Sequence, residues 1–313
     1  MEQRQLGNRG PDVSVLGLGC NNFGMKLDKA SSIAVVHAAL DAGITHLDTA
    51  EMYGQGKSEE FIGEALRGRR DDAVIATKFT PRPKDQDYTP GILRQRIVDA
   101  CEASLRRLQT DHIDLYYQHY PDADGAAVEE ALEALDTLVA SGKIAHLASS
   151  NVSADQIRNN AAIAAQHELT AMCATQEEWS LLNRTIEDQI VPEATEVGLG
   201  IVPYFPLASG LLTGKYRKGQ PFPEGSRLEA MPYFAQGLTD DKWDRLEALI
   251  SFAADHGRTI TELAFGWLLG KPSVASVIAG ATSPEQVGAN AAAVDWRLSS
   301  EQLATVNEIL AGG

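Results

Sequence analysis

The most constraining feature of this sequence is a regular alternation of short β-rich runs with amphipathic helical stretches. Eight strand–helix units follow one another, each about 30 residues long. The expected strands are Ser14–Gly19, Thr45–Asp48, Ala73–Lys78, Ile113–His119, His146–Ser149, Ala174–Gln176, Gly200–Tyr204 and Ala275–Ala279. The expected helices are Lys29–Ala42, Ser58–Leu66, Gly91–Leu108, Val128–Ser141, Ala154–Gln166, Asp188–Val197, Asp241–His256 and Pro284–Ala293. Strict alternation of this kind predicts a parallel sheet with helices packed on it.

The number of units favours a closed barrel over an open, doubly wound sheet, which would alternate in the same way. We therefore expect residues 1–313 to form a single α/β domain, a (β/α)8 or TIM barrel. An N-terminal β-hairpin is expected to run from Gln3–Leu6 through Gly7-Asn8 and back near Val13. Thr261–Leu269 and Ser299–Leu310 are expected to be extra helices towards the C-terminus.

Several residues are typical of helix ends. Ser153 and Ser283-Pro284 are expected to open helices, as is Ser58. Glycines are expected to close helices at positions 43, 68, 142, 198 and 257. The long stretch Pro206–Thr239 is rich in Gly and Pro and breaks the alternation, which indicates a functional loop.

The charge of the chain excludes some classes of partner. With 43 acidic and 27 basic side chains, the formal net charge is −16, which disfavours nucleic acid and anionic membranes as partners. The three cysteines show no C-x-x-C spacing, and no apolar stretch predicts a signal peptide or a membrane span. His112 and His119 lie at an odd separation on one strand, so their side chains are expected to face opposite sides of it. A histidine metal site is therefore not expected. We expect a cytoplasmic protein without a metal, and the sequence does not predict its oligomeric state.

Polar residues gather at the ends of the expected strands, where barrels of this type carry their active sites. The second strand ends in Asp48, with Tyr53 in the loop that follows it. The third strand ends in Lys78 and the fourth in His119. Further polar residues end the next three strands: Ser149, Ser150 and Asn151, then Gln176, then Tyr204. Each residue alone has a structural explanation, but together they predict one active site.

These residue types suit proton transfer to a carbonyl oxygen. A phenol has a pKa near 10, and a neighbouring ammonium such as Lys78 favours the phenolate and lowers that pKa. Asp48 would keep the lysine charged, and His119 would bind the oxygen of the substrate. Because no side chain carries a hydride, this chemistry also requires a nicotinamide cofactor.

Several motifs resemble those of the aldo-keto reductases. The segment Asp48-Thr-Ala-Glu-Met-Tyr-Gly-Gln-Gly-Lys-Ser-Glu59 resembles the signature of that superfamily. The resemblance extends over the whole chain through segments that occur in the same order: Leu16-Gly-Leu-Gly19, Thr77-Lys78, Asp114–His119, Gly142-Lys-Ile144, Ser149–Asn151, Tyr204-Phe-Pro-Leu207, Gly210–Gly214, and Gly280–Gln286 with Asn290.

The resemblance implies a role for each matching residue. Tyr53 would be the general acid and base, tuned by Lys78 and Asp48, with His119 orienting the carbonyl. Tyr204 would stack on the nicotinamide ring. The carboxamide of the nicotinamide would contact Ser150, Asn151 and Gln176. The pyrophosphate would contact Leu207, Ser209, Leu211 and Lys215. The adenosine end of the cofactor would contact Gly280, Thr282, Gln286 and Asn290.

The chain departs from many family members at the 2′-phosphate of NADP. Gly280 and Gln286 stand where those members have Lys and Arg. The chain resembles instead the branch of microbial reductases and potassium-channel β-subunits, in which Lys215 and Arg227 of the long loop would take that role. This implies that NADP(H) is preferred over NAD(H).

Two questions stay open at the level of sequence. Phe23, Trp179 and Tyr233 are candidate walls of a substrate pocket, but ordinary packing at the rim explains them equally well. The expected function is the reduction of aldehydes and ketones, or the reverse reaction on a sugar or another alcohol. The alternative is a regulatory subunit that binds NADP as a redox sensor with little turnover.

Overall fold

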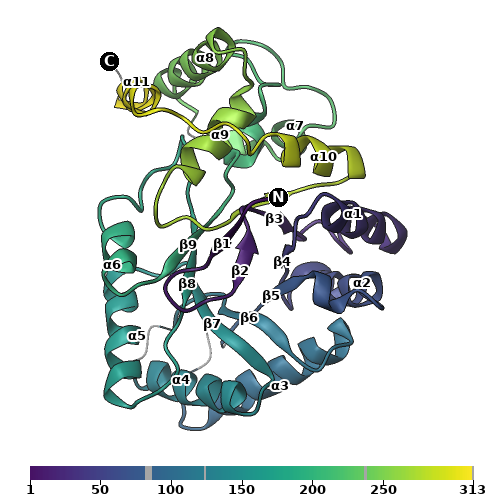
Figure 1. The fold of residues 1–313 in the computed structure, drawn as a ribbon, viewed down its shortest axis with the longest axis vertical. Coiled ribbons are helices and arrows are strands. Elements are labelled where there is room, and N and C mark those ends of the chain that lie inside the picture. The colour runs from purple at the N-terminus through teal and green to yellow at the C-terminus, as the bar shows by residue number, and fades with distance from the viewer. Residues whose placement is uncertain (82–86, 123–124, 236–237, 312–313) are drawn as a thin grey trace.

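Eight parallel strands form the centre of the fold, with helices around them (Figure 1). The structure is a computed structural model that describes residues 1–81, 87–122, 125–235 and 238–311. The strands pair in the order β10-β3-β4-β5-β6-β7-β8-β9, and every neighbouring pair is parallel. Their bounds are β3 (Leu16–Gly19), β4 (His46–Asp48), β5 (Val74–Phe79), β6 (Ile113–Gln118), β7 (Ile144–Ser150), β8 (Ala174–Glu178), β9 (Gly200–Tyr204) and β10 (Val277–Gly280).

A single bridge closes the sheet into a barrel. The N–H of Ile201 on β9 donates to the carbonyl of Ser273 at 2.7 Å, and Ile201 pairs with Val274 just before β10. The expected (β/α)8 barrel is therefore confirmed. The expected first strand, Ser14–Gly19, is divided: β2 (Asp12–Ser14) belongs to the N-terminal hairpin and only β3 joins the barrel.

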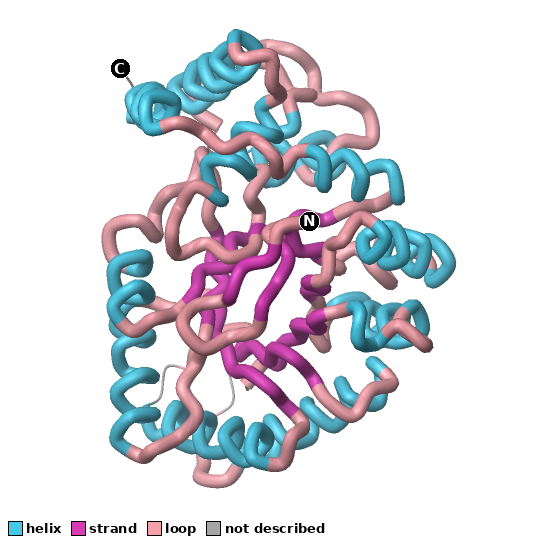
Figure 2. Tube along the Cα trace, in the orientation of Figure 1, coloured by secondary structure: helices cyan, strands magenta, loops and turns pink. Residues whose placement is uncertain are grey.

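Helices cover the outside of the barrel (Figure 2). They are α1 (Lys29–Asp41), α2 (Lys57–Ala65), α3 (Ile92–Leu108), α4 (Gly125–Ala140), α5 (Ala154–Gln166), α6 (Ile190–Glu196), α9 (Ile260–Leu269) and α10 (Pro284–Ala292). The extra helices α8 (Asp240–Asp255) and α11 (Ser300–Ala311) pack against each other at the top of Figure 1. This differs from the expectation for two helices, because Asp241–His256 was expected among the eight barrel helices and Thr261–Leu269 as an extra one, whereas α9 contacts β10 and α8 packs on α11. None of these helices, within the described residues, is long and apolar enough to cross a membrane.

Most of the expected helix ends are confirmed. Ser153 caps α5 in a full capping box with Gln156, and Ser283 caps α10 with proline in the first turn. The expected C-terminal glycines all have a positive φ, for example 79° at Gly43. Ser58 does not cap a helix, because α2 begins at Lys57 and the buried Ser58 hydroxyl bonds to Thr49 and to the carbonyl of Cys20.

The hydrophobic core has two layers, one inside the barrel and one between the strands and the helices. The larger, outer layer contains most of the buried aliphatic side chains. The inner layer includes Leu6 and Val13 of the hairpin formed by β1 (Gln3–Gln5) and β2. A Cβ at Gly7 would lie 2.3 Å from the carbonyl oxygen of Cys173 and 2.6 Å from the nitrogen of Gly200, at the start of β8 and β9. The hairpin therefore plugs the end of the barrel at which the strands begin.

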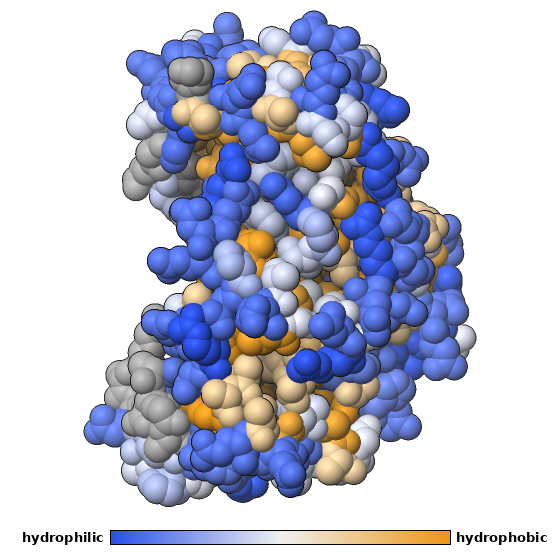
Figure 3. Space-filling view, turned by 60° about the vertical axis from the view of Figure 1, so that its left-hand side comes forward, coloured by the Kyte–Doolittle hydropathy of each residue, from blue (hydrophilic) through white to orange (hydrophobic). Residues whose placement is uncertain are grey.

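The long segment after β9 contains several short elements rather than being irregular throughout. It includes a 3-10 segment at Ala208–Thr213, α7 (Arg227–Ala230) and a 3-10 turn at Pro232–Ala235; residues 236 and 237 lie outside the described residues. The face of the molecule in Figure 3 is mainly hydrophilic, with hydrophobic residues in separate patches. This surface agrees with the high content of acidic side chains.

Two helical glycines provide a test of the packing around the barrel. A Cβ at Gly63 in α2 would lie 2.5 Å from the backbone oxygen of Leu108, whereas a Cβ at Gly288 in α10 would meet nothing within 4 Å. Gly63→Ala is expected to destabilise the fold by about 1–3 kcal/mol, because rigid backbone must move. Gly288→Ala is expected to stabilise it by up to about 1 kcal/mol, because alanine favours a helix. Thermal unfolding of both variants checks this, and a stable Gly63→Ala variant would contradict it.

Candidate active site

Alternation along each strand aims a set of polar side chains at the mouth of the barrel. Successive residues of a strand point to opposite faces. Ala76 of β5 and Ala174 of β8 belong to the inner core, so Lys78 and Gln176, two positions further on, also face inward. Both lie near the C-terminal ends of their strands, which is where the sequence analysis placed the site.

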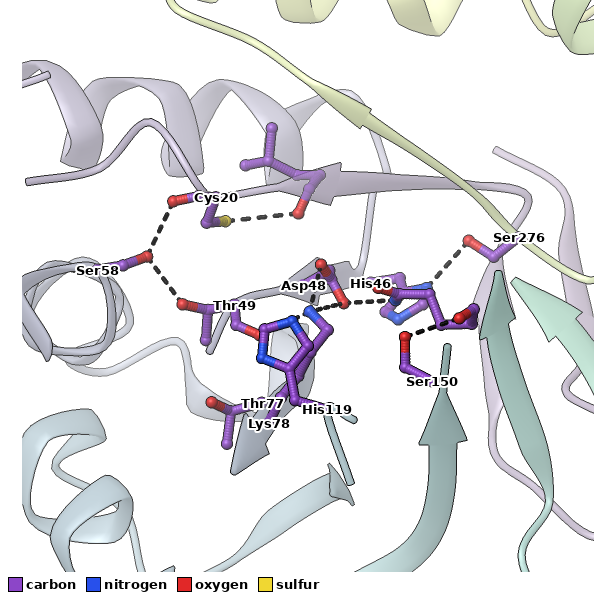
Figure 4. Close-up of polar contacts among 12 residues, drawn as sticks. Cys20, His46, Asp48, Thr49, Ser58, Thr77, Lys78, His119, Ser150 and Ser276 are labelled. Atoms are coloured by element: carbon purple, nitrogen blue, oxygen red, sulfur yellow. Dashed lines mark hydrogen bonds and ion pairs between the residues drawn. The ribbon is translucent and has the colours of Figure 1, made fainter. Parts of the chain in front are cut away.

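The centre of the site is a buried ion pair between Lys78 and Asp48 (Figure 4). The Nζ atom of Lys78 donates to Oδ1 and Oδ2 of Asp48 at 2.7 and 2.8 Å and to the carbonyl of Thr49 at 2.8 Å. The lysine side chain is fully buried. Burial disfavours the ammonium, but the Asp48 carboxylate and then the neighbouring Tyr53 outweigh this and raise the pKa of Lys78. The lysine is therefore a fixed positive charge beneath the site.

Gln176 adds a second bond to the same carboxylate. Its amide nitrogen donates to Oδ1 of Asp48 at 2.8 Å, and the side chain is almost fully buried. This bond places Gln176 beside the ion pair. The sequence analysis assigned Gln176 to the carboxamide of a cofactor, and in the structure its amide nitrogen already has this partner.

Tyr53 lies above the ion pair, in the 3-10 turn that follows β4. The Nζ atom of Lys78 lies 5.2 Å from the centre of its ring, and Tyr53 lines the cavity described below. Burial raises the pKa of the phenol, and Lys78 opposes that shift without cancelling it. The lowered pKa that was expected from Lys78 alone is therefore wrong, because the effect of burial is larger than that of the lysine. Tyr53 consequently holds its proton at neutral pH.

His119 follows β6 and presents a neutral imidazole to the same space. Burial, and then the charge of Lys78, lower its pKa to about 4. Its Nδ1 atom is buried and has no hydrogen-bond partner among the described residues. A buried N–H without a partner costs more than a free acceptor, so this places the proton on Nε2. The ring lies edge-on to Tyr53, with centroids 6.0 Å apart, and stacks on Tyr120 at 4.6 Å.

Asn151 joins His119 to the far wall of the site. Its Nδ2 atom donates to the backbone oxygen of His119 at 3.0 Å, and its Oδ1 atom accepts from the hydroxyl of Tyr204 at 2.8 Å. The residue has a φ of 58°, a left-handed conformation that asparagine tolerates better than most residues. The neighbouring Ser150 hydroxyl donates to the carbonyl of Gln176 at 2.7 Å. The three residues expected at the carboxamide therefore lie together.

These side chains surround one end of a cavity of about 540 Å³. Of the residues named from the sequence, those that line it are Asp48, Tyr53, His119, Ser150, Asn151, Gln176, Tyr204, Leu207, Ser209, Lys215, Arg227, Gly280, Thr282 and Gln286. Its charged lining residues are Lys26, Lys215, Arg227 and Asp48, and Asp48 is paired with Lys78. The cavity is therefore positive in a protein with a net charge of −16, which favours anions.

Several residues named from the sequence do not line the cavity. Leu211 is buried in the core, and Asn290 lies behind Gly280, to whose carbonyl it donates at 3.4 Å. Phe23 is fully buried, and Trp179 packs edge-on against Trp267 in the core. Tyr233 is about half exposed and does not line the cavity either. Packing is thus the explanation that the structure supports for Phe23 and Trp179, whereas Tyr233 lies at the surface.

The cavity also has lining residues that the sequence analysis missed. They include Asn21, Asn22, Lys26, Tyr120 and Gly225, and also Met52, Phe205, Pro206, Gly210 and Thr213, which belong to quoted motifs but were given no role. Most of them follow the ends of β3, β4, β6 and β9. The rule that placed Asp48 at a strand end would have found them if it had been extended into each loop. Met52 and Tyr120 are more than one-third exposed, so the mouth is partly apolar.

Comparisons with known proteins agree with this geometry. Residues 15–311 match the model of the aldo/keto reductase family. The chain is 35% identical to a probable voltage-gated potassium channel subunit beta of Oryza sativa subsp. japonica, over 94% of this chain and 92% of that one. It is 33% identical to the aldo-keto reductase YhdN of Bacillus subtilis, over 99% and 94% of the two chains.

A solved structure shows the same fold. The aldo-keto reductase AKR11C1 from Bacillus halodurans, in its holo form, superposes with a TM-score of 0.80 at 32% identity, covering 99% of this chain and 96% of that one. A (β/α)8 barrel with these residues at its mouth defines the class, an oxidoreductase fold. The chain belongs to the aldo/keto reductase family. Among the described residues, no group of His, Cys, Asp or Glu is arranged to hold a metal ion.

The lowered pKa of His119 leads to a pH prediction. The unfolded chain binds a proton on this ring below about pH 6.5, and the folded protein only below about pH 4. Between these values the unfolded state binds more protons, so His119 makes the free energy of unfolding rise with pH. In a 15N NMR titration the His119 imidazole is expected to stay neutral above about pH 5, with its proton on Nε2. His119→Asn assigns the signal, and a midpoint near pH 6.5 would contradict the prediction.

Proposed function

We propose that this protein is an NADP(H)-dependent oxidoreductase that reduces aldehydes or ketones to alcohols, or catalyses the reverse reaction. The observation that carries the proposal is the convergence of a protonated phenol, Tyr53, and a neutral imidazole, His119, over the buried Lys78–Asp48 pair. Two hydrogen-bond donors at the mouth of one cavity suit a carbonyl oxygen that gains negative charge as the reaction proceeds.

Tyr53 would supply the proton. As negative charge forms on the carbonyl oxygen, the O–H bond of Tyr53 breaks and an O–H bond forms on the product. The phenolate left behind lies beside the ammonium of Lys78, which stabilises it, and Asp48 holds that ammonium in place. A bound nicotinamide would supply the hydride for the carbonyl carbon. In the opposite direction, the same phenolate accepts the proton of an alcohol.

His119 would orient the substrate rather than exchange its proton. With a pKa of about 4, the imidazole is a poor acid–base group at neutral pH but a stable donor. The stack on Tyr120 and the bond from Asn151 to the His119 backbone keep the ring in place. A fixed donor of this kind stabilises the developing charge without having to reorganise.

The remainder of the cavity fits a dinucleotide. Tyr204 offers an aromatic face next to Ser150, Asn151 and Gln176, as a flat ring with a carboxamide requires. In this proposal Leu207, Ser209 and Lys215 would contact the pyrophosphate, and Gly280, Thr282 and Gln286 would contact the adenosine; all six line the cavity. Leu211 and Asn290 would support these walls from behind. The cationic lining suits the phosphates of such a ligand.

A preference for NADP(H) over NAD(H) is part of the proposal. Lys215 and Arg227 line the same cavity, Arg227 with its guanidinium 5.7 Å from the centre of the Phe205 ring. A guanidinium and an ammonium in the lining of one cavity suit the dianionic 2′-phosphate that distinguishes NADP from NAD.

The second candidate function is a nucleotide-binding regulatory subunit with little turnover. It is favoured by the 35% identity to proteins described as potassium channel β-subunits. Such a subunit would keep the cavity and its cofactor. A panel of aldehydes, ketones and alcohols assayed with NADP(H) separates the two, because binding without turnover on any of them would favour the regulatory function.

Tyr53→Phe tests the proton donor. Removal of the hydroxyl is expected to lower kcat for carbonyl reduction by roughly 100-fold or more, the usual size of a general acid contribution. NADPH binding should stay within about twofold, because the ring is retained. Tyr120→Phe is the control, since it keeps the stack on His119 and lies outside the proton path. Equal activity of Tyr53→Phe and wild type would exclude Tyr53 as the acid.

Arg227→Ala tests the cofactor preference. Loss of a charged hydrogen bond is expected to raise KM for NADPH by roughly 10- to 100-fold and to leave KM for NADH within about twofold. Lys218→Ala is a matched control, because this cation of the same segment pairs with Asp244 and does not line the cavity. Comparable kcat/KM for both cofactors in the wild type, or an unchanged preference in Arg227→Ala, would overturn this part of the proposal.

A further inference from the structure

Glu177 is a buried carboxyl group that the proposed mechanism does not use. It lies on β8 between Gln176, which faces the barrel interior, and the end of the strand, so its side chain points out towards the helical shell. It is 4% exposed. None of the described basic side chains forms an ion pair with it, and burial raises its pKa to about 7. A buried carboxyl without a cation is costly unless hydrogen bonds compensate it.

The hydrogen bonds of Glu177 come from its own strand and from the turn after β7. Its Oε1 atom accepts from the Thr175 hydroxyl at 2.7 Å and from the backbone N–H of Val152 at 3.2 Å. The N–H of Asn151 donates to the carbonyl of the adjacent Gln176 at 3.3 Å. The Ser149 hydroxyl donates in turn to Thr175 at 3.3 Å. The end of β8 therefore anchors the two residues with which the chain leaves β7, Asn151 through the backbone of Gln176 and Val152 through the carboxyl of Glu177.

One of those two residues is Asn151, whose side chain links the two walls of the cavity. It holds the backbone of His119 on one side and the hydroxyl of Tyr204 on the other. Its left-handed backbone, with a φ of 58°, needs support from its surroundings. The carboxyl group of Glu177 contributes to this support by holding the next residue, Val152, from the side of the strand that faces away from the cavity.

We propose that Glu177 is a positioning residue for the nicotinamide end of the cavity, acting through Val152 and Asn151 on Tyr204 and His119. This inference rests on the proposed function, because it takes the bound molecule to be a nicotinamide dinucleotide. Loss of the carboxyl would leave the N–H of Val152 buried without an acceptor. The turn would then shift, and the affinity for the cofactor would fall more than the rate of the chemical step.

The test is the dissociation constant of NADPH, measured by fluorescence titration, together with kcat at saturating NADPH. Glu177→Leu is expected to raise Kd by about tenfold or more, with kcat within about threefold of the wild type. Glu177→Gln keeps an oxygen acceptor for Val152 and is expected to restore Kd to within about threefold. A Kd in folded Glu177→Leu equal to that of the wild type would overturn the proposal.

Asp136 offers a matched control for a general loss of stability. Its Oδ1 atom accepts from the N–H and the hydroxyl of Thr170 at 2.8 and 2.7 Å, the same kind of anchor, but in the loop before β8 at the opposite end of the barrel. Asp136→Leu is expected to lower the melting temperature and to leave Kd within about twofold. An equal rise in Kd in this variant would show that Glu177 acts only through general stability.

Two further outcomes are decisive. If Glu177→Leu does not fold, Thr175→Val removes one donor to the same carboxyl, and an unchanged Kd in that folded variant would overturn the proposal. If the wild type does not bind NADPH, the proposed function fails and the role of Glu177 fails with it. Binding by the wild type without turnover on any carbonyl would count against the enzyme alone, and the Kd comparison would still decide the role of Glu177.

Discussion

The site depends on one interaction, the contact between Lys78 and Asp48 inside the mouth of the barrel. Either group alone would be too costly to bury as an ion, and together they share hydrogen bonds that satisfy both. The pair fixes a positive charge under Tyr53, contributes to the low pKa of His119 and gives Gln176 its partner. Loss of one partner would leave the other as an uncompensated buried charge, so stability and chemistry are coupled at this point.

Much of the fold was predictable because strand–helix alternation is a strong local pattern. The eight strands, most helix ends and the hairpin were correct to within a few residues. The division of the first strand was not foreseen, because nothing in the residues around Val15 shows where the chain passes from the hairpin into the barrel. The role of Ser58 was also missed, since a serine before two glutamates looks like a cap when its buried partners, Thr49 and Cys20, are unknown.

The site was predictable to the extent that strand ends converge in a barrel. That rule predicted that Asp48, Tyr53, Lys78 and His119 lie together. In the structure Lys78 pairs with Asp48, and the ring of Tyr53 lies next to that of His119. The direction of the Tyr53 pKa could not be predicted, because it depends on burial, which is a property of the whole fold. The same limit applies to Phe23 and Trp179, whose aromatic rings suit a pocket wall as well as a core. Nothing in the sequence indicated a role for Glu177, because that role depends on its contact with Val152, just after the neighbouring strand β7.

The closed end of the barrel, where the hairpin lies, has a consequence for how molecules enter and leave the cavity. Strand side chains such as Leu115 and Val202 fill the inner core, and Leu6 and Val13 cover it from below, so the barrel is a packed core and not a channel. Two molecules that share the cavity would therefore pass through the same opening, and the one bound deeper would enter first and leave last. Packing far from the site, to which the hairpin of β1 and β2 contributes, thus limits the order of binding at the mouth.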